Sequence, residues 1–216
     1  MKKVRLGVLA SGRGSNLQAI IDNIEKGSLS AKIAVVISDQ PSAYALERAR
    51  QHTIAAVHVS ARGFKGKREE YDSLLVKELQ KWDVDIVCLA GFMRIITPTL
   101  ISAFPNRILN IHPALLPAFP GLHVQKAALE HGVKFSGCTV HFVDEGMDTG
   151  PIIIQAVVPI LDHDTEESLS ARILQQEHTI YSRAIQLYAE GRLSVQGRRV
   201  TVSKGGKSGE EFLINP

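Results

Sequence analysis

The sequence of 216 residues has few cysteines and no long hydrophobic run. Its two cysteines, Cys88 and Cys138, both lie in apolar segments typical of strands, so we expect buried free thiols and a reducing cytoplasm rather than disulfide bonds. The apolar run near the N-terminus is interrupted at Gly12 and Arg13 and is too short for a signal peptide. Because no stretch approaches the roughly 20 apolar residues that span a bilayer, we also expect no membrane contact.

The net charge is small as well. A net charge of +3 does not by itself indicate nucleic-acid binding, and we expect small-molecule ligands and no nucleic acid. Hydrophobic residues make up 44% and charged residues 22% of the chain, which is the balance of a protein with a buried core. We expect a single domain over residues 1–216, as a monomer or a homodimer.

Several catalytic motifs are missing. The chain has no Gly-x-Ser-x-Gly nucleophile elbow and no His-Glu-x-x-His or Cys-x-x-Cys spacing. His112, His123 and His141 could meet in space, but without such a spacing we predict no metal. The GGKS segment at 205–208 lacks the first glycine of a Walker loop, because Thr201 stands there. The chemistry is therefore expected to be metal-free and non-covalent.

What is present is a regular alternation of strands and helices. Apolar runs of strand length stand at residues 4–10, 32–38, 54–59, 85–91 and 107–111. Between them, the spacing of apolar residues predicts helices at 17–27, 44–51 and 69–82. The last of these has Leu74, Leu75, Leu79 and Trp82 on one side. Strands that are apolar throughout and separated by helices indicate a parallel sheet covered on both faces. We predict a doubly wound α/β fold with a mostly parallel, Rossmann-like sheet.

The pattern changes after residue 135. Two apolar strands, GCTVHFVDEG and PIIIQAVVPI, are joined by a short Gly/Asp loop, which predicts an antiparallel extension. A long C-terminal helix is predicted over Glu166 to Glu190, with Asp164 as its cap and Glu167 three residues later. A hairpin is predicted over 193–203, and the role of the tail from residue 204 onward stays open.

The segment SGRGSN at residues 11–16 lies between the first predicted strand and the first predicted helix. A helix N-terminus offers free N–H groups and a positive dipole end, which suits a phosphate. The dinucleotide pattern Gly-x-Gly-x-x-Gly fails because Leu17 stands at its last position, although Asp39 is available as the acidic residue after the second strand. The plain alternative is a strand-to-helix turn capped by Asn16.

Asn110 and His112 end an apolar run and are followed closely by Pro113, Pro117 and Pro120. In a strand the two side chains point to the same side, and the prolines restrict the loop that holds them. An amide can stabilise a developing oxyanion, and an imidazole can move a proton or stabilise negative charge. This combination predicts a preorganised site for acyl transfer.

The candidate partner of His112 is Asp148, in the loop DEGMDTGP between the two late strands. A carboxylate beside an imidazole fixes its orientation and favours its charged form. Gly146 and Gly150 flank Asp148, and we expect their flexibility to let the loop fold over the site. A lone histidine or a Gly/Asp turn is more often structural, so only the combination carries the interpretation.

Several of these segments follow the ends of predicted strands. Ligands in open α/β sheets bind beyond the carboxyl ends of the strands. Residues 12–16, 91–94 and 110–113 occupy such positions. We therefore expect them to converge on one crevice.

Two further features stand out. Glu177 lies within an apolar stripe of the long helix, where burial of a carboxylate costs free energy unless it is paired. We expect Glu177 either to contact a polar ligand group or to reach solvent as a boundary residue. A basic cluster follows Gly63 and is either a solvated surface or a contact for an anionic ligand tail. The stripe contains Ile173, Ile180, Ala184 and Leu187, and the cluster contains Lys65, Lys67 and Arg68.

The segments SGRGSNLQAII, AGFMRI, LNIHPALLPAFPGLH, TVHFVDEGMDTGPII and QQEHTIY occur in this order. They closely resemble the folate-dependent glycinamide ribonucleotide transformylases (phosphoribosylglycinamide formyltransferases) of purine biosynthesis. The resemblance runs from about Val4 to Arg192. The Asn-x-His segment with a downstream Asp is shared more widely among formyl-tetrahydrofolate enzymes, whereas the GSN turn, the PGLH extension and Glu177 point to this family in particular.

The resemblance implies that the amino group of glycinamide ribonucleotide attacks the formyl carbon of 10-formyltetrahydrofolate, a co-substrate. Asn110, His112 and Asp148 match the catalytic residues, with Asp148 holding His112 in its charged form and helping to place an ordered water. The matching substrate contacts are Gly14, Ser15, Asn16, Gly91, Met93 and Glu177. The matching folate contacts are Arg68, Met93, Arg94, Ile95, Ile96, Asn110 and Asp148. The implied division is a nucleotide-phosphate half over 1–105, a catalytic and folate half over 106–192, and a hairpin with its tail over 193–216.

Several alternatives stay open at this point. A formyltetrahydrofolate hydrolase is expected to carry an additional N-terminal domain, whereas the first strand here begins at Val4. A methionyl-tRNA formyltransferase is expected to carry an extra basic C-terminal domain. A non-catalytic nucleotide-binding module would leave Asn110, His112 and Asp148 without a role. A dehydrogenase is disfavoured by Leu17.

Overall fold

The computed structural model describes residues 3–203, so the tail from residue 204 onward lies outside the described part of the chain. The chain groups into two compact units, Met1–Asn110 and Ile111–Pro216, which are described separately here as unit 1 and unit 2. Between residues 3 and 203 no helix combines the length and the apolar character needed to cross a membrane. The prediction of a single domain is not tested by this grouping.

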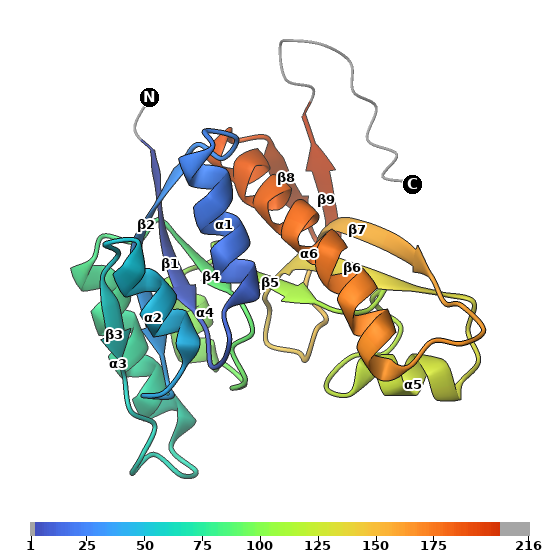
Figure 1. Cartoon of the computed structure of the whole chain (residues 1–216). Helices are drawn as coiled ribbons and strands as arrows, with labels where there is room; N and C mark the ends of the chain where they lie inside the picture. Colours follow the sequence, from blue (N-terminus) through green and yellow to red (C-terminus); the bar gives the residue numbers. More distant parts are fainter. Residues whose placement is uncertain (1–2, 204–216) are drawn as a thin grey trace. The chain divides into compact units, whose positions relative to one another are not determined.

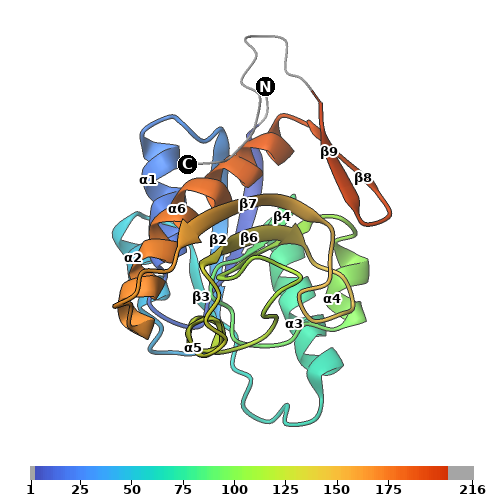
Figure 2. The same ribbon diagram turned by 90° about the vertical axis from the view of Figure 1, so that its right-hand side faces the viewer.

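Unit 1 contains a parallel sheet with strand order β3-β2-β1-β4-β5 (Figure 1). Its strands are β1 (Val4–Leu9), β2 (Ala31–Ser38), β3 (Ala56–His58), β4 (Ile86–Leu89) and β5 (Ile108–His112), the last reaching two residues into unit 2. Its helices are α1 (Ser15–Glu25), α2 (Tyr44–Gln51), α3 (Arg68–Lys81) and α4 (Pro98–Ala103). Figure 2 shows α1 and α2 on one side of these strands and α3 and α4 on the other. The doubly wound α/β prediction is therefore confirmed.

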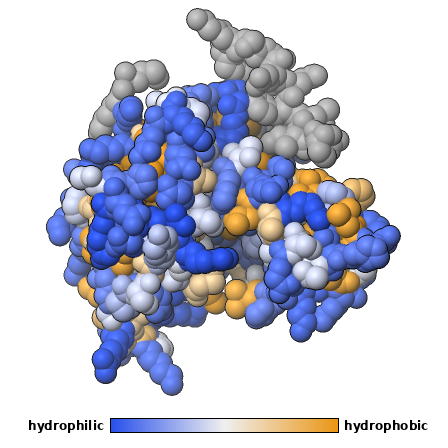
Figure 3. Space-filling model, in the orientation of Figure 1, coloured by the Kyte–Doolittle hydropathy of each residue, from blue (hydrophilic) through white to orange (hydrophobic). Residues whose placement is uncertain are grey.

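The strands of unit 1 are buried because helices cover both faces of the sheet. Leu6, Val8 and Leu9 of β1 are fully enclosed, and so is Cys88 of β4, which is a free thiol as expected. The outward side of the covering helices is polar, and the part of the surface over α1 and α2 is mainly hydrophilic (Figure 3). On α3, Leu75 and Leu79 are buried, but Leu74 is 37% exposed. The prediction that Leu74 belongs to the buried side of this helix was therefore wrong.

Unit 2 has the strand order β6-β7-β9-β8 and carries the predicted antiparallel pair. The strands are β6 (Phe135–Phe142), β7 (Ile152–Pro159), β8 (Leu193–Gln196) and β9 (Arg199–Val202), and the helices are α5 (Val124–Glu130) and α6 (Glu166–Ala189). Strands β8 and β9 form the predicted hairpin. The apolar stripe of the long helix α6 packs on β6 and β7, which explains why its residues are buried (Figure 2). The second free thiol, Cys138, is buried on β6.

The short helices α4 and α5 were not predicted, because six and seven residues carry too little periodicity. The predicted cap of α6 was wrong by one residue. Thr165 is the N-cap: its side chain accepts a hydrogen bond from Ser168 N, and the Ser168 side chain accepts one from Thr165 N. Asp164 instead accepts from Arg172 at 2.7 Å and from Leu161 N at 2.7 Å, so its carboxylate fixes the loop before the helix.

The carboxylate of Asp72 joins α3 to the N-terminus of α4. Its Oδ2 accepts from the backbone N of Thr97 at 2.6 Å and from the hydroxyl of Thr97 at 2.8 Å. Thr97 is the N-cap of α4 but makes no side-chain cap hydrogen bond, so Asp72 provides the acceptor at this helix end. Burial raises the pKa of Asp72, while its bonds to Thr97 act in the opposite direction.

We expect Asp72→Ala to lower the free energy of unfolding by about 2 kcal/mol, because it leaves two buried donors of Thr97 without their acceptor. Urea denaturation of the variant measures this loss. Glu69→Ala, which removes an exposed carboxylate from the same helix, is the matched control and should stay within about 0.5 kcal/mol of the wild type. Equal values for the two variants would contradict a capping role for Asp72.

Candidate active site

Asn110 and His112 lie on the same side of β5, because the strand continues through His112 and side chains alternate along it. Asn110 is half-buried, and His112 is almost fully enclosed. The sequence-based expectation that strand geometry persists through both residues is confirmed. The pair can therefore present an amide and an imidazole to one bound group.

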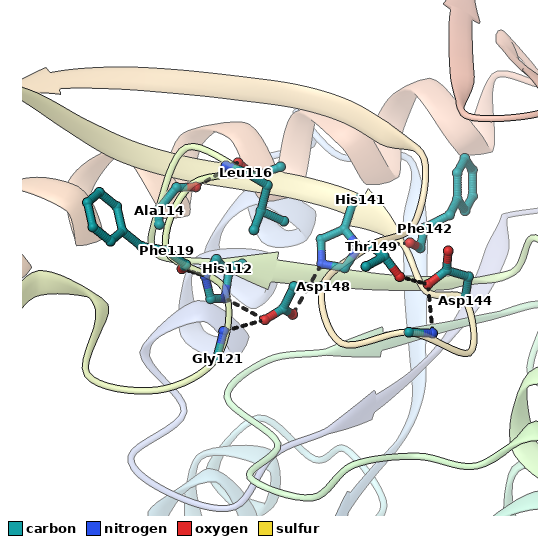
Figure 4. Close-up of polar contacts among 12 residues, drawn as sticks. His112, Ala114, Leu116, Phe119, Gly121, His141, Phe142, Asp144, Asp148 and Thr149 are labelled. Carbon is teal, nitrogen blue, oxygen red and sulfur yellow. Dashed lines mark hydrogen bonds and ion pairs between the residues drawn. The ribbon is translucent and has the colours of Figure 1, made fainter. Parts of the chain in front are cut away.

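The imidazole of His112 is held between a carbonyl and a carboxylate of unit 2 (Figure 4). Its Nε2 lies 2.8 Å from the carbonyl oxygen of Phe119, and because a carbonyl only accepts, Nε2 carries a hydrogen. Its Nδ1 lies 3.4 Å from Oδ2 of Asp148. The same Oδ2 accepts from the backbone N of Gly121 at 2.9 Å. Asp148 thus orients the ring and ties its own loop to the proline-containing loop after β5.

The loop that carries Asp148 is closed by a hydrogen bond between its own side chains. Thr149 donates its hydroxyl hydrogen to Asp144 at 2.6 Å, which closes the loop on itself. A Cβ at Gly146 would collide with the Thr149 side chain, and one at Gly150 would collide with the carbonyl of Phe142. Neither glycine has a positive φ. These glycines therefore allow close backbone approach, and the folding of the loop over the site stays a prediction.

Unusual backbone conformations gather around this contact. Phe119, His123 and Asp148 are non-glycine residues with φ of 52°, 57° and 54°. Such conformations cost free energy and persist where the surrounding contacts enforce them, as they often do at functional sites. Here they aim the Phe119 carbonyl and the Asp148 carboxylate at the His112 ring.

His141 on β6 is a site residue that the sequence indicated only as a possible metal ligand. Its Nδ1 lies 2.8 Å from the carbonyl oxygen of Phe142, so Nδ1 carries a hydrogen, and its Nε2 lies 3.7 Å from Oδ1 of Asp148 (Figure 4). Burial lowers the pKa of His141, which favours the neutral ring. Asp148 therefore lies between two imidazoles. Among residues 3–203, no group of three or more His, Cys, Asp or Glu side chains is arranged to hold a metal ion.

In unit 1, the Gly-rich turn leads directly into α1. The N-cap is Gly14 with φ 70°, which has no side chain to serve as a cap, so the alternative with Asn16 at the cap position was wrong. Asn16 lies buried in the first helical turn. A Cβ on Gly14 would lie 2.8 Å from the Cβ of Ala45, so glycine is needed both for the conformation and for packing on α2.

The loop 91–96 lies beside this turn. Within unit 1 this is the neighbourhood that the predicted strand ends indicated. The backbone N of Ser11 donates to the carbonyl of Gly91 at 2.9 Å. The side chains of Met93 and Ile95 are 67% and 56% exposed. Exposed apolar side chains on a loop next to a helix N-terminus can contact a flat organic ligand.

Glu177 is buried on α6, as its place in the apolar stripe predicted. Cys138 lies nearby on β6: burial raises the pKa of its thiol, and the negative charge of Glu177 adds to this effect. The solvent-boundary alternative for Glu177 was therefore wrong.

Comparison with known proteins shows the family of the chain. The model of the family described as formyl transferase matches residues 4–185. The chain belongs to the formyl transferase family. The sequence is 46% identical over 188 residues to a phosphoribosylglycinamide formyltransferase of Escherichia coli (strain K12), covering 87% of this chain and 88% of that protein.

This formyl transferase is also similar to part of longer proteins. It is 48% identical over 192 residues to the trifunctional purine biosynthetic protein adenosine-3 of Drosophila melanogaster. The matched region covers 88% of this chain but only 14% of the length of that relative. Among solved structures, a glycinamide ribonucleotide transformylase 1 from Symbiobacterium toebii matches with a TM-score of 0.91 and 55% identity. That match covers 94% of this chain and 95% of the other.

The low pKa of buried His141 predicts a pH dependence of stability. Below its ordinary value of 6.5, the unfolded chain takes up a proton that the folded chain does not, so this residue makes stability fall as the pH decreases toward its folded pKa. The slope from one such group is at most about 1.4 kcal/mol per pH unit.

We expect His141→Gln to remove this contribution, so the free energy of unfolding should change less between pH 7 and pH 5 than in the wild type. Urea denaturation across this range measures the difference. His163→Gln, at an exposed histidine, is the control and should keep the wild-type slope. A variant slope equal to that of the wild type would contradict the low pKa.

Proposed function

We propose that the chain transfers the formyl group of 10-formyltetrahydrofolate to the amino group of 5'-phosphoribosylglycinamide, giving formylglycinamide ribonucleotide and tetrahydrofolate in de novo purine biosynthesis. The observation that carries the proposal is the contact of His112 with Asp148, next to Asn110 on β5. The names of the relatives that match most of this chain support the same reaction.

The chemistry requires stabilisation of one oxyanion and movement of one proton. The amine nitrogen attacks the formyl carbon, and the carbonyl oxygen becomes negatively charged in a tetrahedral intermediate. The Asn110 amide and an N–H of His112 donate hydrogen bonds to this oxygen. The nitrogen–carbon bond to tetrahydrofolate then breaks, and a proton leaves the attacking nitrogen while the folate nitrogen gains one.

The position of His112 determines which nitrogen faces the substrate. Nδ1 faces Asp148, and Nε2–H bonds the carbonyl of Phe119. For Nε2–H to donate to the oxyanion, the oxyanion must replace the Phe119 carbonyl as acceptor. Asp148 keeps the ring oriented during this exchange and stabilises the imidazolium. The protein adds no covalent bond to the substrate, so proximity of the two substrates supplies much of the remaining rate.

The remaining contacts are proposed from the family resemblance and from local geometry. The open N-terminus of α1 suits the phosphate, and the exposed apolar side chains of the loop 91–96 suit the pterin ring. Gly14, Ser15, Asn16, Gly91, Met93 and Glu177 are proposed to contact the ribonucleotide. Arg68, Met93, Arg94, Ile95, Ile96, Asn110 and Asp148 are proposed to contact the folate. The protein acts in the cytoplasm, as a monomer or a homodimer.

The proposal is tested by following the folate absorbance change with both substrates present. We expect transfer by the wild type and a loss of about 100-fold or more in kcat for His112→Ala and for Asp148→Asn, since each removes transition-state stabilisation or proton transfer. His163→Ala and Asp162→Asn, at exposed positions of unit 2, are the matched controls and should keep wild-type rates.

The same assay separates the alternatives. Folate product formed without the amine acceptor would identify a formyltetrahydrofolate hydrolase. Ribonucleotide binding by the wild type and by His112→Ala, with no turnover in either, would identify a non-catalytic nucleotide-binding module.

A further inference from the structure

Asp39 follows β2 and has no role in the proposed chemistry, yet it is only 6% exposed. Its Oδ1 accepts from the hydroxyl of Ser11 at 2.6 Å. Its Oδ2 accepts from Nε2 of Gln40 at 3.0 Å and lies 3.9 Å from a guanidinium nitrogen of Arg94. The carboxylate is therefore engaged by the protein itself, which argues against the ribose contact that a dinucleotide site would require of it.

Ser11 connects Asp39 to the loop 91–96. A hydroxyl has one hydrogen, and because a carboxylate only accepts, this hydrogen goes to Asp39. The oxygen of Ser11 is then oriented to accept, and it receives the backbone N–H of Met93 at 2.9 Å. Together with the bond from Ser11 N to the Gly91 carbonyl, the residue that opens the Gly-rich turn holds two backbone groups of the neighbouring loop.

The far end of this loop is also anchored. The Asp72 carboxylate holds Thr97 by two hydrogen bonds, and the guanidinium of Arg94 stacks over the ring of Tyr71 at 4.8 Å. Between these anchors, the apolar side chains of Met93 and Ile95 remain exposed. The position of these side chains therefore depends on Ser11 at one end and on Asp72 at the other.

We propose that Ser11 and Asp39 are positioning residues that couple the two substrate loops. Ribonucleotide binding restricts the motion of the turn 11–16. Because Ser11 is hydrogen-bonded to Met93, the motion of the loop 91–96 is restricted as well, and the folate then binds this loop more tightly. The coupling is reciprocal, so bound folate tightens ribonucleotide binding by the same factor. This inference rests on the proposed function, because that function assigns one substrate to each loop.

Binding measurements test the coupling without turnover. The dissociation constant of 5-formyltetrahydrofolate, used as a non-transferring probe, is measured by calorimetry with and without saturating glycinamide ribonucleotide. For the wild type we expect the ribonucleotide to tighten probe binding about fivefold or more. Ser11→Ala should bring this ratio close to one, because Met93 N–H loses its acceptor.

Variants at the second position distinguish the hydrogen bond from a general loss of structure. Asp39→Ala should also abolish the coupling, because the Ser11 hydroxyl loses the acceptor that orients it. Asp39→Asn should keep most of it, since the amide oxygen can accept the same hydrogen. Ser73→Ala removes a hydroxyl that bonds the carbonyl of Glu69 within α3 and should keep the wild-type ratio. Hydrogen exchange of the Met93 amide gives a second readout: the ribonucleotide should slow it in the wild type and not in Ser11→Ala.

The outcomes separate the inference from the proposed function. If the wild type binds both ligands and transfers the formyl group, but shows no coupling or keeps it in Ser11→Ala, the inference is overturned and the function stands. If the wild type neither binds the folate nor transfers the formyl group, the proposed function fails, and the inference fails with it.

Discussion

The carboxylate of Asp148 organises the candidate site of unit 2, because its two oxygens face groups from three separate segments. One oxygen faces the His112 ring at the end of β5 and the backbone of Gly121, and the other faces His141 on β6. The backbone N–H of Gly121 donates to this carboxylate, and a carboxylate that is largely shielded from water gains more from such a bond than a solvated one. The unusual φ of Asp148 is part of the same arrangement, since it aims the side chain inward.

In unit 1, backbone geometry determines how the Gly-rich turn leads into α1. Gly14 begins α1 in a conformation and a space that a side chain would not tolerate. Ser11 then relates this helix end to the neighbouring loop through hydrogen bonds to Gly91 and Met93. Parallel strands bring these segments together because β1 and β4 are adjacent and end at the same edge of the sheet.

The fold and the central residues were predictable from local pattern, and the remainder depended on tertiary contacts. Continuous apolar strands predicted the parallel sheet, and the Asn-x-His spacing predicted a shared face because strand geometry has a period of two. His141 was not recognised as a partner of Asp148, since its register beside the loop depends on the pairing of β6 with β7. The cap of α6 was misplaced because Arg172, eight residues away, engages Asp164. Asp39 was considered for the wrong role, because its bond to Ser11 spans residues far apart in the sequence.

The two buried thiols offer an independent use of the structure. Cys88 lies in the sheet of unit 1 and Cys138 in that of unit 2, and neither is exposed in the folded chain. Only a thiolate reacts readily with an alkylating reagent, and burial of Cys138 raises the pKa of its thiol further. Each cysteine can therefore be labelled only when its own unit opens. The chain thus contains one natural reporter of local unfolding for each half, and pulsed alkylation can time the opening of the two units separately.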